Sequence, residues 1–329
     1  MTAISRRALL QGALASALVP AAGFARASAP KDYPTRAIKW VLPYLAGTGP
    51  DNTARILADA VSPLLGQPVV IENRGGAAGN IGARMVANAA PDGYTWIYSA
   101  APMAANMRMF KQPGYDALKD FRHVMRVASS DILLVVNAAS GIQTLDELLA
   151  RLRATPGQTN YASGGVGTPS HLGVEMMLMS THTQALHVPY KGASEIINAV
   201  LGKQVSFGMP IFSVALSQIQ AGKLRALAVA GNRRNPMLPD VPTLGELGVK
   251  GMELTSWGGV SVPANTPDDI VTRIRGAFDA ALKQPAVVTL LEKQGGRLDI
   301  QDSATYTKGF TQEIAFTETM MKRLGLQPI

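Results

Sequence analysis

Hydrophobic and polar positions follow two patterns along the chain, short β-rich runs and longer runs with helical periodicity. The first β-rich run, residues 38–44, leads through a glycine loop into a run after Asp51 whose apolar residues share one helix face. This order of strand, turn and helix recurs, which indicates an α/β fold with a mostly parallel sheet in each half. The expected strands are residues 38–44, 69–72, 94–99, 132–137, 159–162, 185–189, 205–209 and 224–230. The first expected helix is capped by Asp51 and ends near Pro63. The other expected helices are residues 81–90, 145–154, 169–179, 193–201, 213–220, 267–283 and 304–324.

The N-terminus has the layout of an export signal. Arg6 and Arg7 precede an almost uncharged run over residues 8–25, and a small-x-small triplet follows at residues 25–27. This pattern predicts a cleaved signal peptide over residues 1–27, similar to a twin-arginine signal, and a periplasmic location. The pattern leaves the choice between the twin-arginine and the general secretory route open.

Composition indicates a globular chain of about two domains, since 47% of the 329 residues are hydrophobic and 16% are charged. The absence of cysteine excludes disulfides and thiolate chemistry. The net charge is +8, and removal of Arg6, Arg7 and Arg26 leaves 28 − 23 = +5. These charges are scattered and form no basic stripe with aromatic residues, so we expect no nucleic-acid partner.

The stretch YASGGVGTPSHL, residues 161–172, predicts a glycine turn that leads into a helix start. Thr168 suits the N-cap and Pro169 the first helical position. The first turn of a helix leaves amides unpaired, and the preceding glycines allow a ligand to approach them, so the turn could hold a carboxylate. A tight turn that binds nothing is the equally good alternative for this stretch alone.

A second loop, residues 45–51, has the same arrangement of glycines before a helix. Ligands of parallel sheets bind beyond the carboxyl ends of the strands, where such loops gather. Two matching loops, one in each half of the chain, therefore favour a binding cleft between them.

Motifs for catalysis, phosphate binding or metal binding are missing from the sequence. It contains no Walker loop, no G-x-S-x-G elbow and no S-x-x-K, and Ser170 stands where a dinucleotide fingerprint needs glycine. His171 and Glu175 share a helix face, but two ligands make no metal site, and a capping or packing histidine is the better interpretation. We therefore expect neither an enzyme nor a metal or other cofactor.

Seven segments in order resemble the Bug family, also called TctC, the periplasmic solute-binding proteins of tripartite tricarboxylate transporters. The resemblance implies a two-lobed Venus-flytrap fold of the type II class. Residues 31–131 and 257–329 would form one lobe and residues 132–256 the other. The segments are YPTRAIKWVLPYLAG (33–47, with Asp51), VVIENRGGAAGNIGA (69–83), PDGYT (91–95), YASGGVGTPSHL (161–172), HVPYKG (187–192), LRALAV (224–229) and LPDVPTLGELG (238–248).

The resemblance also implies which residues hold a small carboxylate, mainly through backbone amides and waters. Two departures, Tyr44 in place of the usual phenylalanine and Thr48 in place of a glycine, predict a narrower or more polar pocket. For Lys191, a structural role is the alternative to ligand binding. The candidates are Tyr44, Ala46, Gly47, Thr48 and Asp51 on the first loop, Ser163, Gly165, Val166, Gly167, Thr168 and Ser170 on the second, and Ser99, Ala100, Tyr190 and Lys191 elsewhere.

The resemblance implies a monomeric receptor that captures an organic carboxylate, closes by a hinge motion and delivers its ligand to the membrane subunits of a transporter. A receptor that signals without transport is one alternative, and a secreted hydrolase or lyase that uses the same cleft is another.

Overall fold

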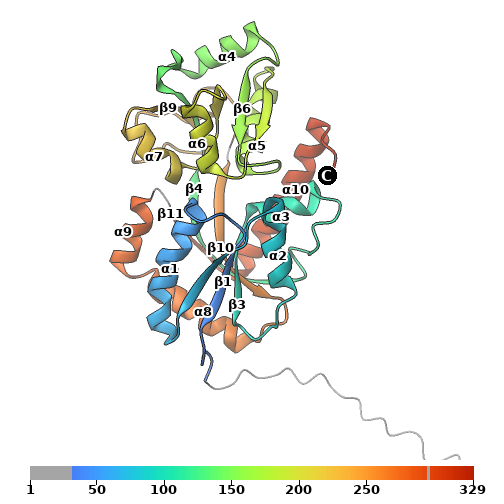
Figure 1. The fold of residues 1–329 in the computed structure, drawn as a ribbon, viewed down its shortest axis with the longest axis vertical. Helices are drawn as coiled ribbons and strands as arrows, with labels where there is room; N and C mark the ends of the chain where they lie inside the picture. Colours follow the sequence, from blue (N-terminus) through green and yellow to red (C-terminus); the bar gives the residue numbers. More distant parts are fainter. Residues whose placement is uncertain (1–31, 253, 295–296) are drawn as a thin grey trace, which may run out of the picture.

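The computed structural model describes residues 32–252, 254–294 and 297–329 and shows two β-sheets, each covered by helices on both faces (Figure 1). The predicted signal peptide, residues 1–27, lies outside the described residues. No helix in the described part of the chain is long and apolar enough to cross a membrane.

The first sheet has six strands in the order β11-β4-β10-β3-β1-β2. Helices α1, α8 and α9 cover one face, where Trp40, Trp96 and Phe278 pack together, and α2, α3 and α10 cover the other, where Tyr306 and Phe310 pack. The elements are β1 (Ile38–Leu42), β2 (Val69–Asn73), β3 (Thr95–Ala100), β4 (Phe121–Asp131), β10 (Thr255–Pro263), β11 (Arg297–Gln301), α1 (Gly49–Leu65), the 3₁₀ turn η1 (Ala77–Gly79), α2 (Asn80–Ala87), α3 (Ala101–Met109), α8 (Asp268–Ala281), α9 (Pro285–Lys293) and α10 (Ser303–Leu324).

The second sheet has five strands in the order β7-β6-β8-β5-β9. Helices α4 and α5 pack on one face and α6 and α7 on the other. The elements are β5 (Leu133–Asn137), β6 (Asn160–Ser163), β7 (Leu186–Pro189), β8 (Phe207–Gly208), β9 (Leu224–Val229), the 3₁₀ turn η2 (Ala138–Ser140), α4 (Leu145–Ala154), α5 (Pro169–Ser180), α6 (Ala193–Leu201) and α7 (Phe212–Gln220).

The predicted two-lobed α/β fold is confirmed, but both sheets are mixed, whereas we expected mostly parallel ones. In the first sheet β1 is parallel to β2 and β3, while β10 is antiparallel to β3 and β4, and β11 is antiparallel to β4. In the second sheet β6 is parallel to β7 and β8, while β5 is antiparallel to β8 and β9. The reason is that β4 carries the chain toward the second sheet and β10 brings it back, so these two strands run in opposite directions.

Helices with clear caps match the sequence prediction well. Thr144 accepts a hydrogen bond from the amide of Glu147 and begins α4 as expected, and α6 has the predicted bounds. The prediction that Asp51 caps the first helix is wrong, because Thr48 is the N-cap of α1 and Asp51 lies in its first turn. The α-helices and strands absent from the prediction are α3, β4, α9, β10 and β11.

The C-terminal helix α10 packs against both halves of the molecule. Tyr306 and Phe310 belong to the core of the first sheet, whereas Met320 is buried in the core of the second. Chain connections between the two sheets are β4, which leads to β5, and β10 (Figure 1). The predicted lobe boundaries, between residues 131 and 132 and between residues 256 and 257, fall in these connections and stay a prediction.

Replacing Met320 by alanine should lower the free energy of unfolding by about 2–5 kcal/mol, because truncation leaves a cavity in the core of the second sheet. Urea unfolding measures this change. Thr319→Ala, at the neighbouring exposed position of α10, is the matched control and should change stability by less than about 0.5 kcal/mol. Equal effects of the two substitutions would contradict the packing of α10 on the second sheet.

Candidate functional site

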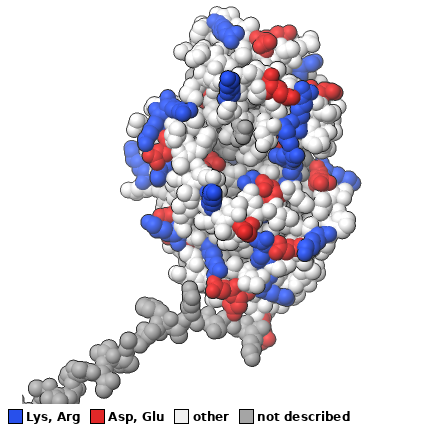
Figure 2. Space-filling model, turned by 180° about the vertical axis from the view of Figure 1, so that it is seen from behind, with Lys and Arg blue, Asp and Glu red and all other residues white. Residues whose placement is uncertain are grey.

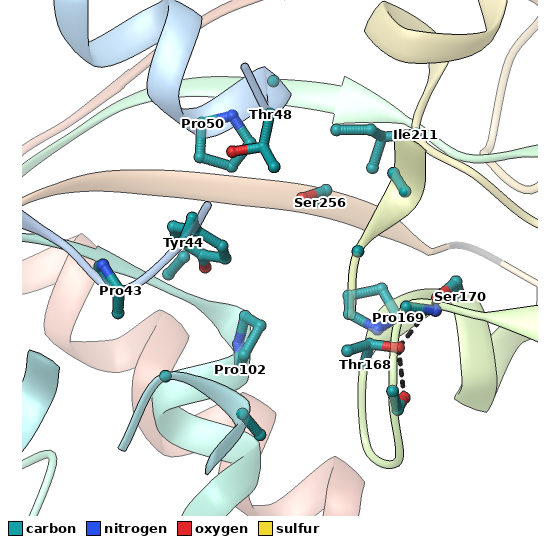
Figure 3. A pocket seen from close by; sticks show the side chains of 18 of the residues that line it. Pro43, Tyr44, Thr48, Pro50, Pro102, Thr168, Pro169, Ser170, Ile211 and Ser256 are labelled. Atoms are coloured by element: carbon teal, nitrogen blue, oxygen red, sulfur yellow. Dashed lines mark hydrogen bonds between the residues drawn. The ribbon is translucent and has the colours of Figure 1, made fainter. Parts of the chain in front are cut away.

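A cleft of about 710 Å³ lies between the two sheets and is lined by residues from both. The first half of the molecule contributes the loop after β1, the turn after β2 and the end of β3, and the second half contributes the loops after β6 and β7. Residues of β4 and β10, including Ser130 and Ser256, line it where these strands pass between the halves. Figure 3 shows Tyr44 and Pro102 across the cavity from Thr168 and Pro169.

Most of the predicted ligand residues line this cleft, and the rest are not among its lining residues. Those that line it are Tyr44, Thr48, Ala100, Gly165, Val166, Thr168, Ser170, Tyr190 and Lys191. Those that are not among the lining residues are Ala46, Gly47, Asp51, Ser99, Ser163 and Gly167. Several of the second group form hydrogen bonds that hold the lining loops in place.

Asp51 organises the first loop from behind. Its buried carboxylate accepts hydrogen bonds from the Gly47 amide at 2.8 Å, from Arg55 Nε at 3.0 Å and from Asn73 Nδ2 at 2.9 Å. Burial alone would raise the pKa of Asp51, but the hydrogen bonds from Arg55, Gly47 and Asn73 outweigh it and hold the pKa below its ordinary value. Asp51 therefore remains charged and supports the loop.

Of the two expectations for Thr48, a narrower or a more polar pocket, its contacts favour the narrower one. Its hydroxyl donates to the Leu45 carbonyl at 2.8 Å and so is used within the loop. Its methyl carbon lies 4.0 Å from the position that a Cβ on Gly192 would occupy. Thr48 therefore narrows the cleft with an apolar group.

Most amides of the second loop are already hydrogen bonded, which corrects the expectation that they are unpaired. The amide of Gly164 donates to Ser170 Oγ at 2.9 Å and that of Gly165 to Ser163 Oγ at 3.1 Å. The amide of Gly167 donates to His171 Nδ1 at 3.2 Å, and the amide of Thr168 donates to the Gly165 carbonyl at 3.3 Å. Serine and histidine side chains next to a turn compete for its amides, and glycine spacing alone does not reveal this.

Two amides of this loop remain available for a ligand. Val166 N–H has no hydrogen-bond partner among the described residues, and Ser170 N–H lies in the first turn of α5, where a helix has no acceptor of its own. Both residues line the cleft. On the opposite wall, Gly49 N–H is the first amide of α1. The cleft is thus bordered by two helix N-termini, each of which carries partial positive charge.

A stack of three aromatic side chains supports the second loop. The rings of His171 and His187 stack at 4.2 Å between centroids, and those of His187 and Tyr161 at 4.9 Å. Ser163 Oγ lies 2.6 Å from His187 Nε2, and His171 Nδ1 accepts the Gly167 amide. Both histidines therefore act as packing and hydrogen-bonding residues of the loop.

Ser99 has a comparable supporting role in the first sheet. Its buried hydroxyl lies 2.6 Å from Ser261 Oγ and 2.9 Å from the Tyr306 hydroxyl, so it joins β3 to β10 and α10. The next residue, Ala100, lines the cleft.

The turn after β2 also lines the cleft and has an unusual backbone. Gly76, Ala77, Ala78 and Gly79 all have positive φ angles, of 114°, 46°, 54° and 91°. Alanine rarely adopts this conformation, which costs on the order of 1–2 kcal/mol per residue. Asn106 stabilises the turn by donating to the Ala78 carbonyl at 3.0 Å. The glycines were visible in the sequence as a turn, but their position at the cleft was not.

The two halves approach each other closely at glycines on both sides of the cleft. A Cβ on Gly49 would lie 2.7 Å from Ile211 Cδ1, and a Cβ on Gly167 would lie 2.7 Å from Met109 Cγ. Larger residues at these positions would separate the two walls. Other lining residues that sequence reasoning missed are Tyr98, Pro102, Phe110, Ser129, Ser256, Trp257, Gly258 and Ile211.

Burial of His123 and His171 and partial burial of His187 should make the protein less stable as the pH falls below about 6.5. Burial lowers the pKa of His123 to about 4 and that of His187 to about 4, and burial together with repulsion from His187 lowers that of His171 to about 3. Between these values and the unfolded pKa of about 6.5, the unfolded chain binds more protons than the folded one, so stability rises with pH in this range.

Urea unfolding between pH 6.5 and 4.5 tests this linkage. Each histidine that is neutral in the folded protein and protonated in the unfolded chain contributes up to about 1.4 kcal/mol per pH unit to the slope of the unfolding free energy against pH. His187→Phe should therefore flatten the dependence of unfolding free energy on pH, whatever its effect on stability at pH 7. Parallel pH profiles of the variant and the wild type would contradict the prediction.

Comparison with known proteins agrees with this geometry. The family model described as tripartite tricarboxylate transporter family receptor, TctC, matches residues 53–326. The chain is 33% identical over 294 residues to protein BugT of Bordetella pertussis, a match that covers 89% of this chain and 90% of that protein.

Two solved structures share the fold over nearly their whole length. The periplasmic binding protein BugD is 31% identical with a TM-score of 0.85, over 90% of this chain and 100% of that chain. MatC from Rhodopseudomonas palustris with bound malate is 28% identical with a TM-score of 0.82, over 88% of this chain and 99% of that chain. The chain therefore belongs to the TctC family of tripartite tricarboxylate transporter receptors.

Proposed function

We propose that the protein is a periplasmic receptor that captures a small organic carboxylate in the cleft and delivers it to a membrane transporter of the tripartite tricarboxylate type. The observation that carries the proposal is the convergence of the free amides of Val166 and Ser170 with the N-terminus of α1 across one cavity. Amides at helix N-termini hold an anion without a charged side chain. The malate in MatC supports a carboxylate as the ligand.

Closure of the cleft would follow from contacts of the ligand with both halves. A ligand that bridges the Val166 loop and the Thr48 loop has a higher affinity for the closed state than for an open one, so it shifts the population toward closure. The strands β4 and β10 are the connections that would bend.

The charge distribution agrees with a small-molecule ligand. Figure 2 shows acidic and basic side chains interspersed over the face that it displays. Within the described part of the chain, Lys191 is the one residue with a charged side chain that lines the cleft. A carboxylate would therefore be held mainly by neutral donors, with Lys191 adding attraction that salt screens.

A panel of carboxylic acids in thermal-shift measurements tests this function, because a ligand that binds only the folded state raises the melting temperature. The panel contains citrate, malate, acidic amino acids, aromatic acids and nicotinate, with the corresponding neutral amides as controls. At least one acid should stabilise the protein at a concentration at which its amide does not. Turnover of a stabilising acid, followed by mass spectrometry, would instead support an enzyme, and no stabilisation by any acid would contradict the proposal.

Replacing Val166 by proline should weaken binding of the stabilising acid about tenfold or more. The substitution removes an amide donor, and a charge-assisted hydrogen bond contributes roughly 1.5–3 kcal/mol. Val166→Ala keeps the amide, serves as the matched control and should change affinity less than about threefold. Calorimetric titration measures both variants, and equal affinities of the two would show that this amide does not hold the acid.

Transport is tested separately in cells that carry the gene. Deletion of the receptor should abolish uptake of the radiolabelled acid, and a plasmid copy should restore it. Unchanged uptake would favour a receptor that signals without transport.

A further inference from the structure

Tyr98 places a phenol whose hydroxyl has no partner among the described residues in the wall of the cleft. The residue is 4% exposed and lines the cavity, and its hydroxyl has no hydrogen-bond partner among the described residues. Its ring lies over Gly258, where a Cβ would be only 2.6 Å from the Tyr98 hydroxyl oxygen. The glycine thus provides the space that lets this phenol reach the cleft. A hydroxyl that has no protein partner and lies in the cleft wall is available to a ligand with a matching group.

Tyr44 gives the same wall a second phenol. Its ring packs edge-on against that of Tyr98, with 6.2 Å between centroids, and its hydroxyl also has no partner within the described residues. Burial raises the pKa of both tyrosines well above 10, so both phenols stay neutral and can donate hydrogen bonds.

The cleft that contains the two phenols is lined partly by apolar rings, although serines of β4 and β10 also line it. Pro43, Pro102 and Phe110 line the cleft together with them. The cationic side chain of Arg126, which acts electrostatically on Tyr98, pairs with Asp299, so its charge is already compensated. Aromatic and proline rings favour a planar apolar body between them.

We propose that the ligand is an aromatic monocarboxylate that bears a hydroxyl group, and that Tyr98, assisted by Tyr44, hydrogen-bonds this hydroxyl. The inference rests on the proposed function, since the carboxylate occupies the amides of Val166 and Ser170. In this inference, the two phenols recognise the end of the ligand that lies opposite its carboxylate.

A second carboxylate fits this wall less well than a neutral hydroxyl. Lys191, the charged side chain of the lining, lies on the loop after β7, on the side of the carboxylate site. A second negative charge between the phenols would lose its hydration without a cation to compensate it, and this costs more than burial of a hydroxyl that two phenols can satisfy. The inferred ligand class therefore differs from the dicarboxylate malate that MatC contains.

Two ligands that differ only in the hydroxyl provide the test, 3-(4-hydroxyphenyl)propionate and 3-phenylpropionate, with benzoate and 4-hydroxybenzoate as a shorter pair. Calorimetric titration should show that the wild type prefers the hydroxylated member of at least one pair about tenfold. Tyr98→Phe keeps the ring on Gly258 but lacks the hydroxyl, so it should reduce this preference to less than about twofold and leave the affinity for the unsubstituted acid nearly unchanged.

Tyr94→Phe is the matched control. Tyr94 precedes the same strand, β3, its ring packs against Tyr33, and it is not among the residues that line the cleft. This variant should keep the wild-type preference for the hydroxylated ligand. Melting temperatures of both variants show that they are folded.

The outcomes separate this inference from the proposed function. Equal binding of the hydroxylated and unsubstituted acids by the wild type, or an unchanged preference in Tyr98→Phe, would overturn the role of the phenols. Tighter binding of malate or citrate than of every aromatic acid would overturn the ligand class, while the carboxylate receptor would stand. Binding of no acid at all would overturn both.

Discussion

The antiparallel pairing of β4 with β10 is the constraint on which the rest of the structure depends. The two strands pair from Thr255 opposite Asp131 to Pro263 opposite Phe121. They carry the chain from one sheet to the other and back, so their pairing fixes where the two halves meet. The same segments line the cleft, and Gly258 on β10 makes room for the ring of Tyr98. The strands β4 and β10 therefore both connect the two halves and form part of the cleft wall.

Hydrogen bonds within the second loop leave few of its amides free for a ligand. A loop with many free amides would bind water or any small anion. Here the side chains of Ser163, Ser170 and His171 accept hydrogen bonds from the amides of Gly165, Gly164 and Gly167, respectively. Few amide donors of the loop are therefore left to face the cavity. A rigid turn with few, fixed donors loses little entropy when a ligand binds, and it places those donors more accurately than a mobile one.

The cleft combines weak positive potential with neutral, largely apolar walls. Two helix N-termini attract an anion, while Thr48 directs a methyl group inward and its hydroxyl elsewhere. The phenols of Tyr44 and Tyr98 add polarity without charge. Under the proposed function, this division of roles would place the carboxylate of a ligand at one end of the cleft and its apolar body at the other. In a receptor, such a division supports discrimination among acids by their bodies, since all of them share the carboxylate.

The sequence by itself determined those helices whose signals lie in neighbouring residues of the chain. Caps, prolines and periodicity predicted α4, α5 and α6 to within a residue or two, because backbone capping and amphipathic faces depend on neighbours in the chain. Glycines and helix starts also predicted the loops around Thr48 and Thr168, and the resemblance added the two-lobed fold and the individual ligand candidates, many of which line the cleft.

The tertiary structure alone decided what depends on distant residues. Strands β4 and β10 contain polar and glycine residues that interrupt the strand pattern, so their existence and direction follow from pairing with each other. The amides that stay free depend on side chains such as His171, which reach them only after folding. Tyr98 faces the cleft because Gly258, far along the chain, leaves a space beside it, and no local pattern encodes such a contact.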